Sequence, residues 1–311
     1  MKGEDIVLYR IIDFFELVDL ISTGTMRFTN ASNFKDRNEL LGVFFRILEN
    51  PVTHPFSKGE IDKIIESYEE CKQSYFISCW SKRRDSIAMW ELYSPHFSGV
   101  QVGVKKRLIV RSVEKFVKDN NFAKAHYASP SDGRLLFYPV EYGDCIYVDY
   151  DKILSDMKEK FFDFYSRWSG RARLEEDKFK KEYKAFSNEM TESSICGEFL
   201  KDIAYRHEEE FRFVLRSVTR NDREYEDCRK DPFFVLFDSH LRGARLSDFS
   251  GNNIFLEFDS AEIDEVWIDS RMPDWKKEVQ IKILRDLGVE ASVSGAYGRF
   301  FDRHDLTPMR D

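Results

Sequence analysis

The segment Tyr205–Arg216 places three consecutive carboxylates directly before an alternating aromatic and basic run. From Glu209 on, apolar side chains recur every second residue, which is the pattern of a half-buried β-strand. On a strand, Glu208, Glu210 and Arg212 share one face at spacings of about 7 Å, and Glu209 lies on the other face. Two carboxylates beside a guanidinium suit a sugar or nucleotide site. In a helix, the same residues would instead form an ordinary surface ion pair.

Composition limits the classes of protein to which this chain can belong. Its 311 residues are 42% hydrophobic and 15% aromatic, enough for a substantial core in one large domain or two small ones. The net charge of −8 argues against broad, non-specific nucleic-acid binding. Five cysteines without a C-x-x-C pair fit a reducing compartment, and six histidines without metal spacing predict no metal site. Neither a signal peptide nor an apolar span is found, so we expect a cytoplasmic protein outside the membrane.

Hydrophobic periodicity predicts a single α+β domain over 1–311. Asp13 and Glu16 form a capping box before a short helix that Gly24 ends. Without a long run of βα alternation, Rossmann and barrel folds are disfavoured. We expect mixed, mainly antiparallel strands, with a helical insertion over 151–200. Strands are expected at 6–12, 26–28, 75–80, 100–104, 135–142, 145–148, 233–237, 254–258, 263–268 and 289–293. The other helices are expected at 57–71, 86–93, 194–205 and 274–287, and within 151–192, where a Ser-Gly break at 169–170 separates two helices.

A series of short motifs follows in a fixed order over about residues 8–290. It consists of Leu8-Tyr9-Arg10; Gly24; Arg27-Phe28; Phe34, Asp36 and Glu39; Ser78; Met89-Trp90 and Tyr93; Gly99-Val100 and Val102-Gly103; and Tyr205, Glu208, Glu210 and Arg212. The ordered set resembles a family of bacterial and phage proteins catalogued as a domain of unknown function. The chain departs from that family at Arg37, Phe97 and Tyr205, where the family usually has proline, histidine and tryptophan.

The order of a strand arginine, a strand serine and a late strand glutamate also resembles the ADP-ribosyltransferase superfamily, which splits NAD at the nicotinamide–ribose bond. This second resemblance implies an ADP-ribosyltransferase-like split sheet with flanking helices. It further implies an NAD-dependent ADP-ribosyltransferase or NAD glycohydrolase, such as a toxin or phage-defence effector. NAD would be the substrate, and the acceptor would be a protein, a nucleic acid or water.

The same resemblance assigns roles to individual residues. Glu210 would stabilise the positive charge that develops at the ribose C1′, and Glu208 would orient the acceptor or a water molecule. Arg10 would grip the pyrophosphate, for which a guanidinium fork is well suited, and Arg212 would hold the two glutamates. The remaining cofactor-binding residues would be Tyr9, Ser78, Trp80, Trp90 and Tyr93.

Simpler interpretations of these residues remain open. Ser78 is also explained as a buried, satisfied hydroxyl, and Trp90 and Tyr93 at helical spacing are typical of a core. Asp36 suits an Asx-turn, and the basic run 82–84 suits a solvated loop. At the level of function, the alternative is a non-catalytic nucleotide-sensing or protein-binding module, with the insertion available to dock a partner. A hydrolase of another kind is disfavoured, because two carboxyl groups on one strand face do not flank a sugar.

Overall fold

The protein forms a largely antiparallel, open sheet with several helices, as the α+β pattern predicts. The computed structural model describes residues 6–36, 38–43, 65–66, 68–120, 134–137, 141–168, 171, 174–179, 181–182, 185–186, 197–220 and 253–297. The strands are β1 (Val7–Asp13), β2 (Thr25–Asn30), β3 (Tyr75–Ser81), β4 (Gly99–Lys105), β5 (Arg134–Phe137), β6 (Glu141–Asp144), β7 (Ile146–Val148), β8 (Leu200–Asp202), β9 (Glu210–Arg220), β10 (Ile254–Glu257), β11 (Ile263–Ile268) and β12 (Ser292–Val293). The longer helices are α1 (Phe14–Thr23), α4 (Ile87–Tyr93), α5 (Lys106–Asn120), α6 (Tyr150–Trp168) and α10 (Asp274–Asp286).

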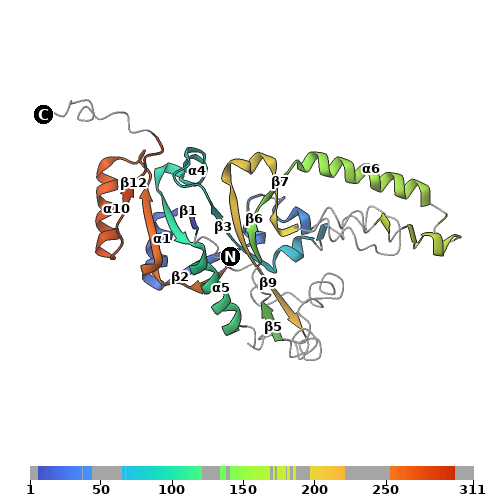
Figure 1. Cartoon of the computed structure of the whole chain (residues 1–311), viewed down its shortest axis with the longest axis horizontal. Coiled ribbons are helices and arrows are strands. Elements are labelled where there is room, and N and C mark those ends of the chain that lie inside the picture. The colour runs from blue at the N-terminus through green and yellow to red at the C-terminus, as the bar shows by residue number, and fades with distance from the viewer. Residues whose placement is uncertain are drawn as a thin grey trace.

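Strand β3 lies in the middle of the sheet, and other strands pair with both of its edges (Figure 1). On one edge, β9 pairs with the whole of β3, from Tyr75 opposite Arg216 to Ser81 opposite Glu210. On the other edge, β2 pairs near the start of β3 and β1 pairs with its last residue, Ser81. Beyond β1 the order continues through β4, β11 and β12, and beyond β2 it ends at β10. The sheet is therefore split between β1 and β2.

Different helices cover the two faces of the sheet. On one face, α1, α5 and α10 contribute Leu17, Ile109 and Leu284 to a large hydrophobic core. On the opposite face, α4 packs Trp90 against Ile11 of β1. Each fully buried aliphatic or aromatic side chain of this kind contributes about 1.5–3 kcal/mol of transfer free energy. Both faces of the sheet are thus packed with apolar side chains.

Helix α1 begins and ends where the sequence predicts. The Asp13 carboxylate accepts a hydrogen bond from the Phe15 N–H at 2.8 Å. The helix ends at Gly24, whose φ of 64° lies in the left-handed region that favours glycine. Glu16 does not complete the predicted capping box; its carboxylate instead pairs with Arg27 of β2. This contact ties α1 to the strand on the far side of the split.

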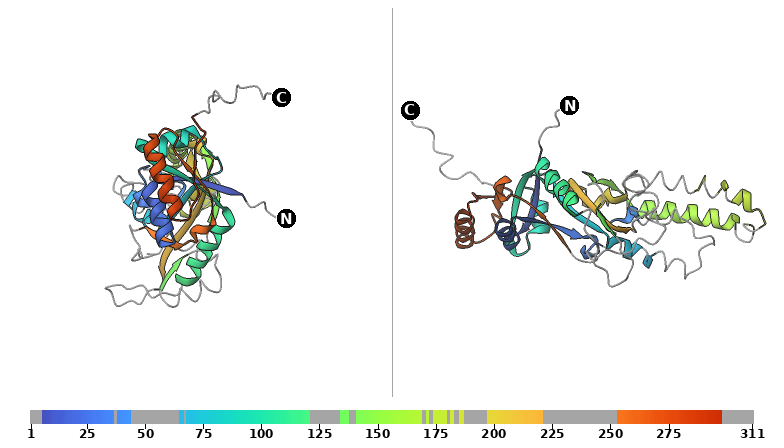
Figure 2. Two further views of the ribbon diagram at one scale, coloured as in Figure 1. Left: turned by 90° about the vertical axis from the view of Figure 1, so that its left-hand side faces the viewer. Right: turned by 90° about the horizontal axis from the view of Figure 1, so that it is seen from below.

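The helical insertion is rooted in a small parallel sheet. β7 and β8 pair from Ile146 opposite Leu200 to Val148 opposite Asp202. Between them α6 runs for 19 residues and projects beyond the main sheet (Figures 1 and 2). The Tyr150 hydroxyl donates to the Leu200 carbonyl at 2.8 Å and closes the base of the insertion. The first predicted helix of the insertion is confirmed, and much of the remainder lies outside the described residues. No helix in the described ranges is both long enough and apolar enough to cross a membrane.

Some local predictions were wrong. Helix α5 was not predicted, although Leu108, Ile109 and Val113 recur at helical spacing. Residues 197–205, predicted to be helical, form β8 between two 3-10 helices, Gly197–Phe199 and Ile203–Glu208. Pairing with β7 outweighs helical propensity there. The strand predicted at 135–142 is two strands, β5 and β6, which both pair with β9. The predicted strand at 233–237 and the start of the helix predicted at 57–71 lie outside the described residues.

Candidate functional site

The sheet divides the predicted site residues between its two faces. In an antiparallel pair, residues directly opposite each other point to the same face. Glu210 lies opposite Ser81, and Arg212 lies opposite Cys79, so these side chains share one face. Ser78 comes directly before Cys79 on β3, so its side chain points to the other face. The single pocket that the resemblance implied is therefore replaced by two separate groups of residues.

The first group lies at the split and contains Arg10, Ser78 and Trp80. The Trp80 indole N–H donates to the Ser78 hydroxyl at 2.9 Å. The Arg10 Nη1 lies 3.4 Å from the same hydroxyl and 3.5 Å from the carbonyl oxygen of Arg27. Ser78 and Trp80 are buried, whereas the Arg10 side chain is 19% exposed. The Ser78 hydroxyl thus contacts both Arg10 and Trp80 and is a buried hydroxyl with its hydrogen bonds satisfied.

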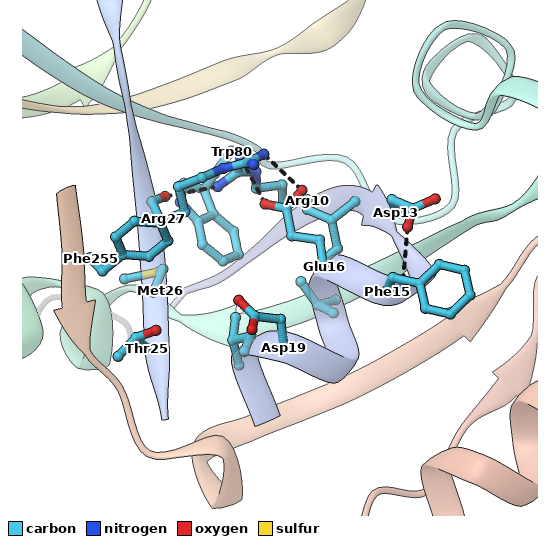
Figure 3. A pocket seen from close by; sticks show the side chains of 13 residues that line it. Arg10, Asp13, Phe15, Glu16, Asp19, Thr25, Met26, Arg27, Trp80 and Phe255 are labelled. Carbon is cyan, nitrogen blue, oxygen red and sulfur yellow. Dashed lines mark hydrogen bonds and ion pairs between the residues drawn. The ribbon is translucent and has the colours of Figure 1, made fainter. Parts of the chain in front are cut away.

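A cavity of about 450 Å³ opens beside this group, between β1, α1 and β2. Arg10 and Arg27 line it together with the aromatic rings of Trp80 and Phe255, and α1 adds carboxylates that include Asp19. Figure 3 shows the two arginines together near Trp80, while Asp19 extends from α1 at a distance from them. The volume lies within the range of about 300–1,000 Å³ that is usual for small-molecule sites. The cavity therefore has a cationic part, an acidic part and aromatic walls.

The two arginines of the cavity make few short hydrogen bonds with the residues that the structure describes. Arg10 makes long contacts, including 3.7 Å from its Nη2 to the Glu16 carboxylate. Arg27 makes one short ion pair, 2.8 Å from Nη2 to Glu16, and its buried Nε has no hydrogen-bond partner among the residues that the structure describes. An arginine carries five N–H donors in a planar fork. Donors of both residues are therefore left for a ligand.

The second group is a buried chain of ion pairs on the opposite face. The Arg212 guanidinium donates from Nε to Glu210 at 2.7 Å and lies 2.6 Å from Glu39 through Nη1. The Lys201 ammonium bridges Glu210 and Glu208. None of these five side chains is more than 10% exposed. Three carboxyl groups and two cations are thus held out of water together.

Burial and charge act in opposite directions on the pKa values of this network. Burial alone would raise the pKa of Glu210, but the Arg212 and Lys201 charges outweigh it and hold the pKa of this carboxyl well below its usual range. Burial would lower the pKa of Lys201, but the neighbouring anions, Glu210 foremost, raise it. For Glu39 the balance is reversed, since burial raises its pKa and Arg212 offsets only part of the effect.

The Glu39 pKa predicts a pH-dependent effect of the Glu39→Gln substitution. Between the ordinary pKa of 4.5 and the raised value, the folded wild type binds more protons than the unfolded chain, so its stability falls as pH rises. Glutamine does not titrate. We therefore expect Glu39→Gln to gain stability relative to wild type as the pH rises from about 4.5 toward the raised pKa, by at most about 1.4 kcal/mol per pH unit. Urea unfolding of both proteins from pH 4.5 to 8 measures this, and a difference that stays flat or falls with pH contradicts it.

The buried network reaches the surface at one end. Tyr93 of α4 donates its hydroxyl to Glu208 at 2.5 Å, and its side chain is 41% exposed. The ring of Tyr205 lies 4.8 Å from the Lys201 ammonium. Glu209 takes a left-handed φ of 42°, so β9 begins one residue later than predicted and Glu208 lies before the strand. The Glu209 side chain points away, as predicted, and pairs with Arg83 at 2.5 Å.

Two predicted residues join neither group. Tyr9 lies opposite Gly103 and Ser81, on the face away from Arg10, and burial raises its pKa. Trp90 is fully buried and donates its indole N–H to Asp85 at 2.9 Å. Its interpretation as a core residue is the one that the packing supports.

The basic run 82–84 has a structural explanation in its ion pairs. Each of its side chains contacts a different carboxylate. The pairs are Lys82 with Asp144 at 2.5 Å, Arg83 with Glu209 at 2.5 Å, and Arg84 with Glu265 at 3.0 Å. All three cations are 40–50% exposed, as the solvated-loop interpretation predicts.

Sequence reasoning missed several residues of both groups. Lys201 carries no local motif, and the role of Glu39 in its loop could not be assigned. Asp36 makes the predicted Asx-turn, accepting from the Asn38 N–H at 2.9 Å. Glu16 and Phe255 belong to the cavity only because α1 and β10 flank β2. Within the described ranges no cluster of three or more histidine, cysteine or acidic residues is placed to hold a metal ion, and Cys71, Cys79 and Cys145 form no disulfide.

Comparison with known proteins gives one match. A family model described as "Protein of unknown function (DUF2971)" matches residues 89–213. The matched range runs from α4 into β9 and includes Tyr93, Lys201, Glu208, Glu210 and Arg212, whereas the cavity residues of β1, α1 and β2 precede it. No curated protein and no solved structure matches the chain.

Proposed function

We propose that this protein binds a nucleotide in the cavity between β1, α1 and β2, and that NAD is the first ligand to test. The main support for the proposal is that Arg10 of β1 and Arg27 of β2 line the same cavity at the split, next to the indole ring of Trp80. Guanidinium groups bind phosphate oxygens through paired, charge-assisted hydrogen bonds. An exposed aromatic ring such as that of Phe255 stacks on bases.

The acidic part of the cavity supports the same ligand class. Asp19 lines the cavity on the α1 side, at a distance from the arginines (Figure 3). Carboxylates accept hydrogen bonds from ribose hydroxyls in dinucleotide sites. A nucleotide offers phosphate, sugar hydroxyls and a flat base, which correspond to the cationic, acidic and aromatic parts. Phe255 is 51% exposed and is accessible to a base at the rim.

Cleavage of NAD, as in an ADP-ribosyltransferase or NAD glycohydrolase, is the second candidate function. It is favoured by Glu210, whose lowered pKa keeps it ionised at neutral pH. An ionised carboxylate stabilises an oxocarbenium-like transition state. However, Glu210 is 3% exposed and faces away from Arg10, so cleavage would require NAD on the Tyr93 side of the sheet. We therefore place binding without turnover first.

A time course with NAD separates the two functions. Calorimetry measures binding, and mass spectrometry of the same samples measures released nicotinamide. For binding without turnover, we expect wild type and folded Glu210→Gln to bind NAD equally well and to release no nicotinamide. Turnover by wild type that Glu210→Gln reduces by about 10²–10³-fold would establish the second candidate instead. Glu210 is buried in the ion network, so Glu210→Gln can fail to fold. In that case Tyr93→Phe replaces it, because this variant removes only one hydrogen bond to Glu208.

A further inference from the structure

We propose that Glu16 occupies the phosphate position of the cavity in the free protein, and thereby restricts the site to ligands with a diphosphate. This inference rests on the proposed nucleotide binding. The Glu16 carboxylate contacts both arginines, at 2.8 Å from the Arg27 Nη2 and 3.7 Å from the Arg10 Nη2. One oxygen faces each guanidinium, as oxygens of a bound phosphate would.

The fold explains why Glu16 lies there. Arg10 is on β1 and Arg27 is on β2, the two strands that diverge from β3. α1 directly connects these strands, and Glu16 is in its first turn. Its side chain is 23% exposed, so a ligand can reach the ion pairs from solvent. The carboxylate therefore spans the split without being locked in the core.

The internal carboxylate competes with an incoming anion. Because it is part of the chain, its effective concentration at the arginines is in the millimolar range or above. A single phosphate only replaces one bridging anion by another, so its binding gains little free energy. A diphosphate brings more negative charge and one phosphate group for each guanidinium, so it can displace the carboxylate. The expected ligand class is therefore a nucleoside diphosphate or a dinucleotide joined by a pyrophosphate.

Asp19 provides a matched control on the same helix. It is one turn beyond Glu16 and lines the same cavity, but it makes no ion pair with either arginine in the described part of the chain. Glu16→Gln and Asp19→Asn each remove one negative charge from one wall. A general change in the electrostatic potential of the cavity would narrow the ratio of ADP to AMP affinity in both variants. Removal of a bridging carboxylate would narrow this ratio in Glu16→Gln alone.

Calorimetric titration of AMP and ADP into wild type, Glu16→Gln and Asp19→Asn at one salt concentration tests the inference. We expect wild type to bind ADP at least about tenfold more tightly than AMP. Glu16→Gln should raise AMP affinity by about tenfold and narrow the ADP to AMP ratio to a few-fold. Asp19→Asn should change the affinities for AMP and ADP by the same factor, because both ligands carry the ribose that Asp19 would bind, and should therefore leave the ADP to AMP ratio unchanged. Thermal unfolding checks that both variants fold, and Glu16→Ala replaces Glu16→Gln if the latter does not.

The outcomes separate this inference from the proposed function. Unchanged or weaker AMP binding by folded Glu16→Gln overturns the role of Glu16, and so does an equal gain in Asp19→Asn. If ADP still binds in those cases and Arg10→Gln weakens that binding by at least about tenfold, the proposed nucleotide site is retained. If neither nucleotide binds to any of the proteins, the proposed function fails together with the inference.

Discussion

Replacing Arg212 by methionine is expected to lower the free energy of unfolding by about 3–5 kcal/mol, the usual cost of leaving a buried charge without its partner. The Arg212 side chain is fully buried and lies between Glu210 and Glu39. It also donates to the Glu198 carbonyl at 2.8 Å. Methionine has a similar length but no charge, so the two carboxyl groups lose their shared cation. Urea unfolding monitored by circular dichroism measures the loss.

Two further proteins make this result interpretable. Arg83→Met removes an exposed guanidinium with one ion pair to Glu209, and we expect little measurable change in stability. In Arg212→Met combined with Glu210→Met, both charges are removed, so part of the lost stability should return. If Arg212→Met costs no more than the exposed control, the ion network does not stabilise the fold and its burial has another explanation.

The second large effect is expected at Arg10. Changing Arg10 to glutamine should weaken NAD binding by at least about tenfold, because a charge-assisted hydrogen bond to phosphate contributes about 1.5–3 kcal/mol. The present contacts of Arg10 to Ser78 and Arg27 are 3.4 and 3.5 Å long, so little internal structure depends on them. Isothermal titration of NAD into the variant and the wild type gives the two dissociation constants.

Arg84→Gln is the matched control for this measurement. Arg84 is partly exposed, pairs with Glu265 at 3.0 Å and lies 4.4 Å from the ring of Trp267, away from the cavity. The substitution makes the same change in net charge as Arg10→Gln. Equal weakening in both variants would point to a general effect of net charge. A loss confined to Arg10→Gln locates the phosphate at the split.

Local structure was predictable from the sequence where local chemistry determines it. The strand predicted at 263–268 has the bounds of β11, and α10 has nearly its predicted length before Gly288. Asp13 and Gly24 set the ends of α1 through their own side chain and backbone. In each case the determining groups lie within a few residues of each other, so periodicity and capping residues are sufficient.

The site depends on contacts that no local pattern contains. Lys201 pairs with Glu210 of β9, and Glu39 pairs with Arg212 of the same strand, but the sequence around Lys201 and around Glu39 gives no sign of these contacts. The motif residues Arg10 and Glu210 were expected in one pocket, yet strand pairing places them on opposite faces of the sheet. Which residues face each other across a sheet depends on strand order and register, and these are properties of the whole fold.

A crystal structure of the wild-type protein with NAD is the most direct test of the proposed site. We expect the pyrophosphate between Arg10 and Arg27, the Glu16 carboxylate displaced from Arg27, and a base or nicotinamide ring against Phe255. NAD bound instead on the opposite face, against Tyr93 and Glu208, would contradict the proposed site. NAD absent from both faces at saturating concentration would contradict NAD binding itself.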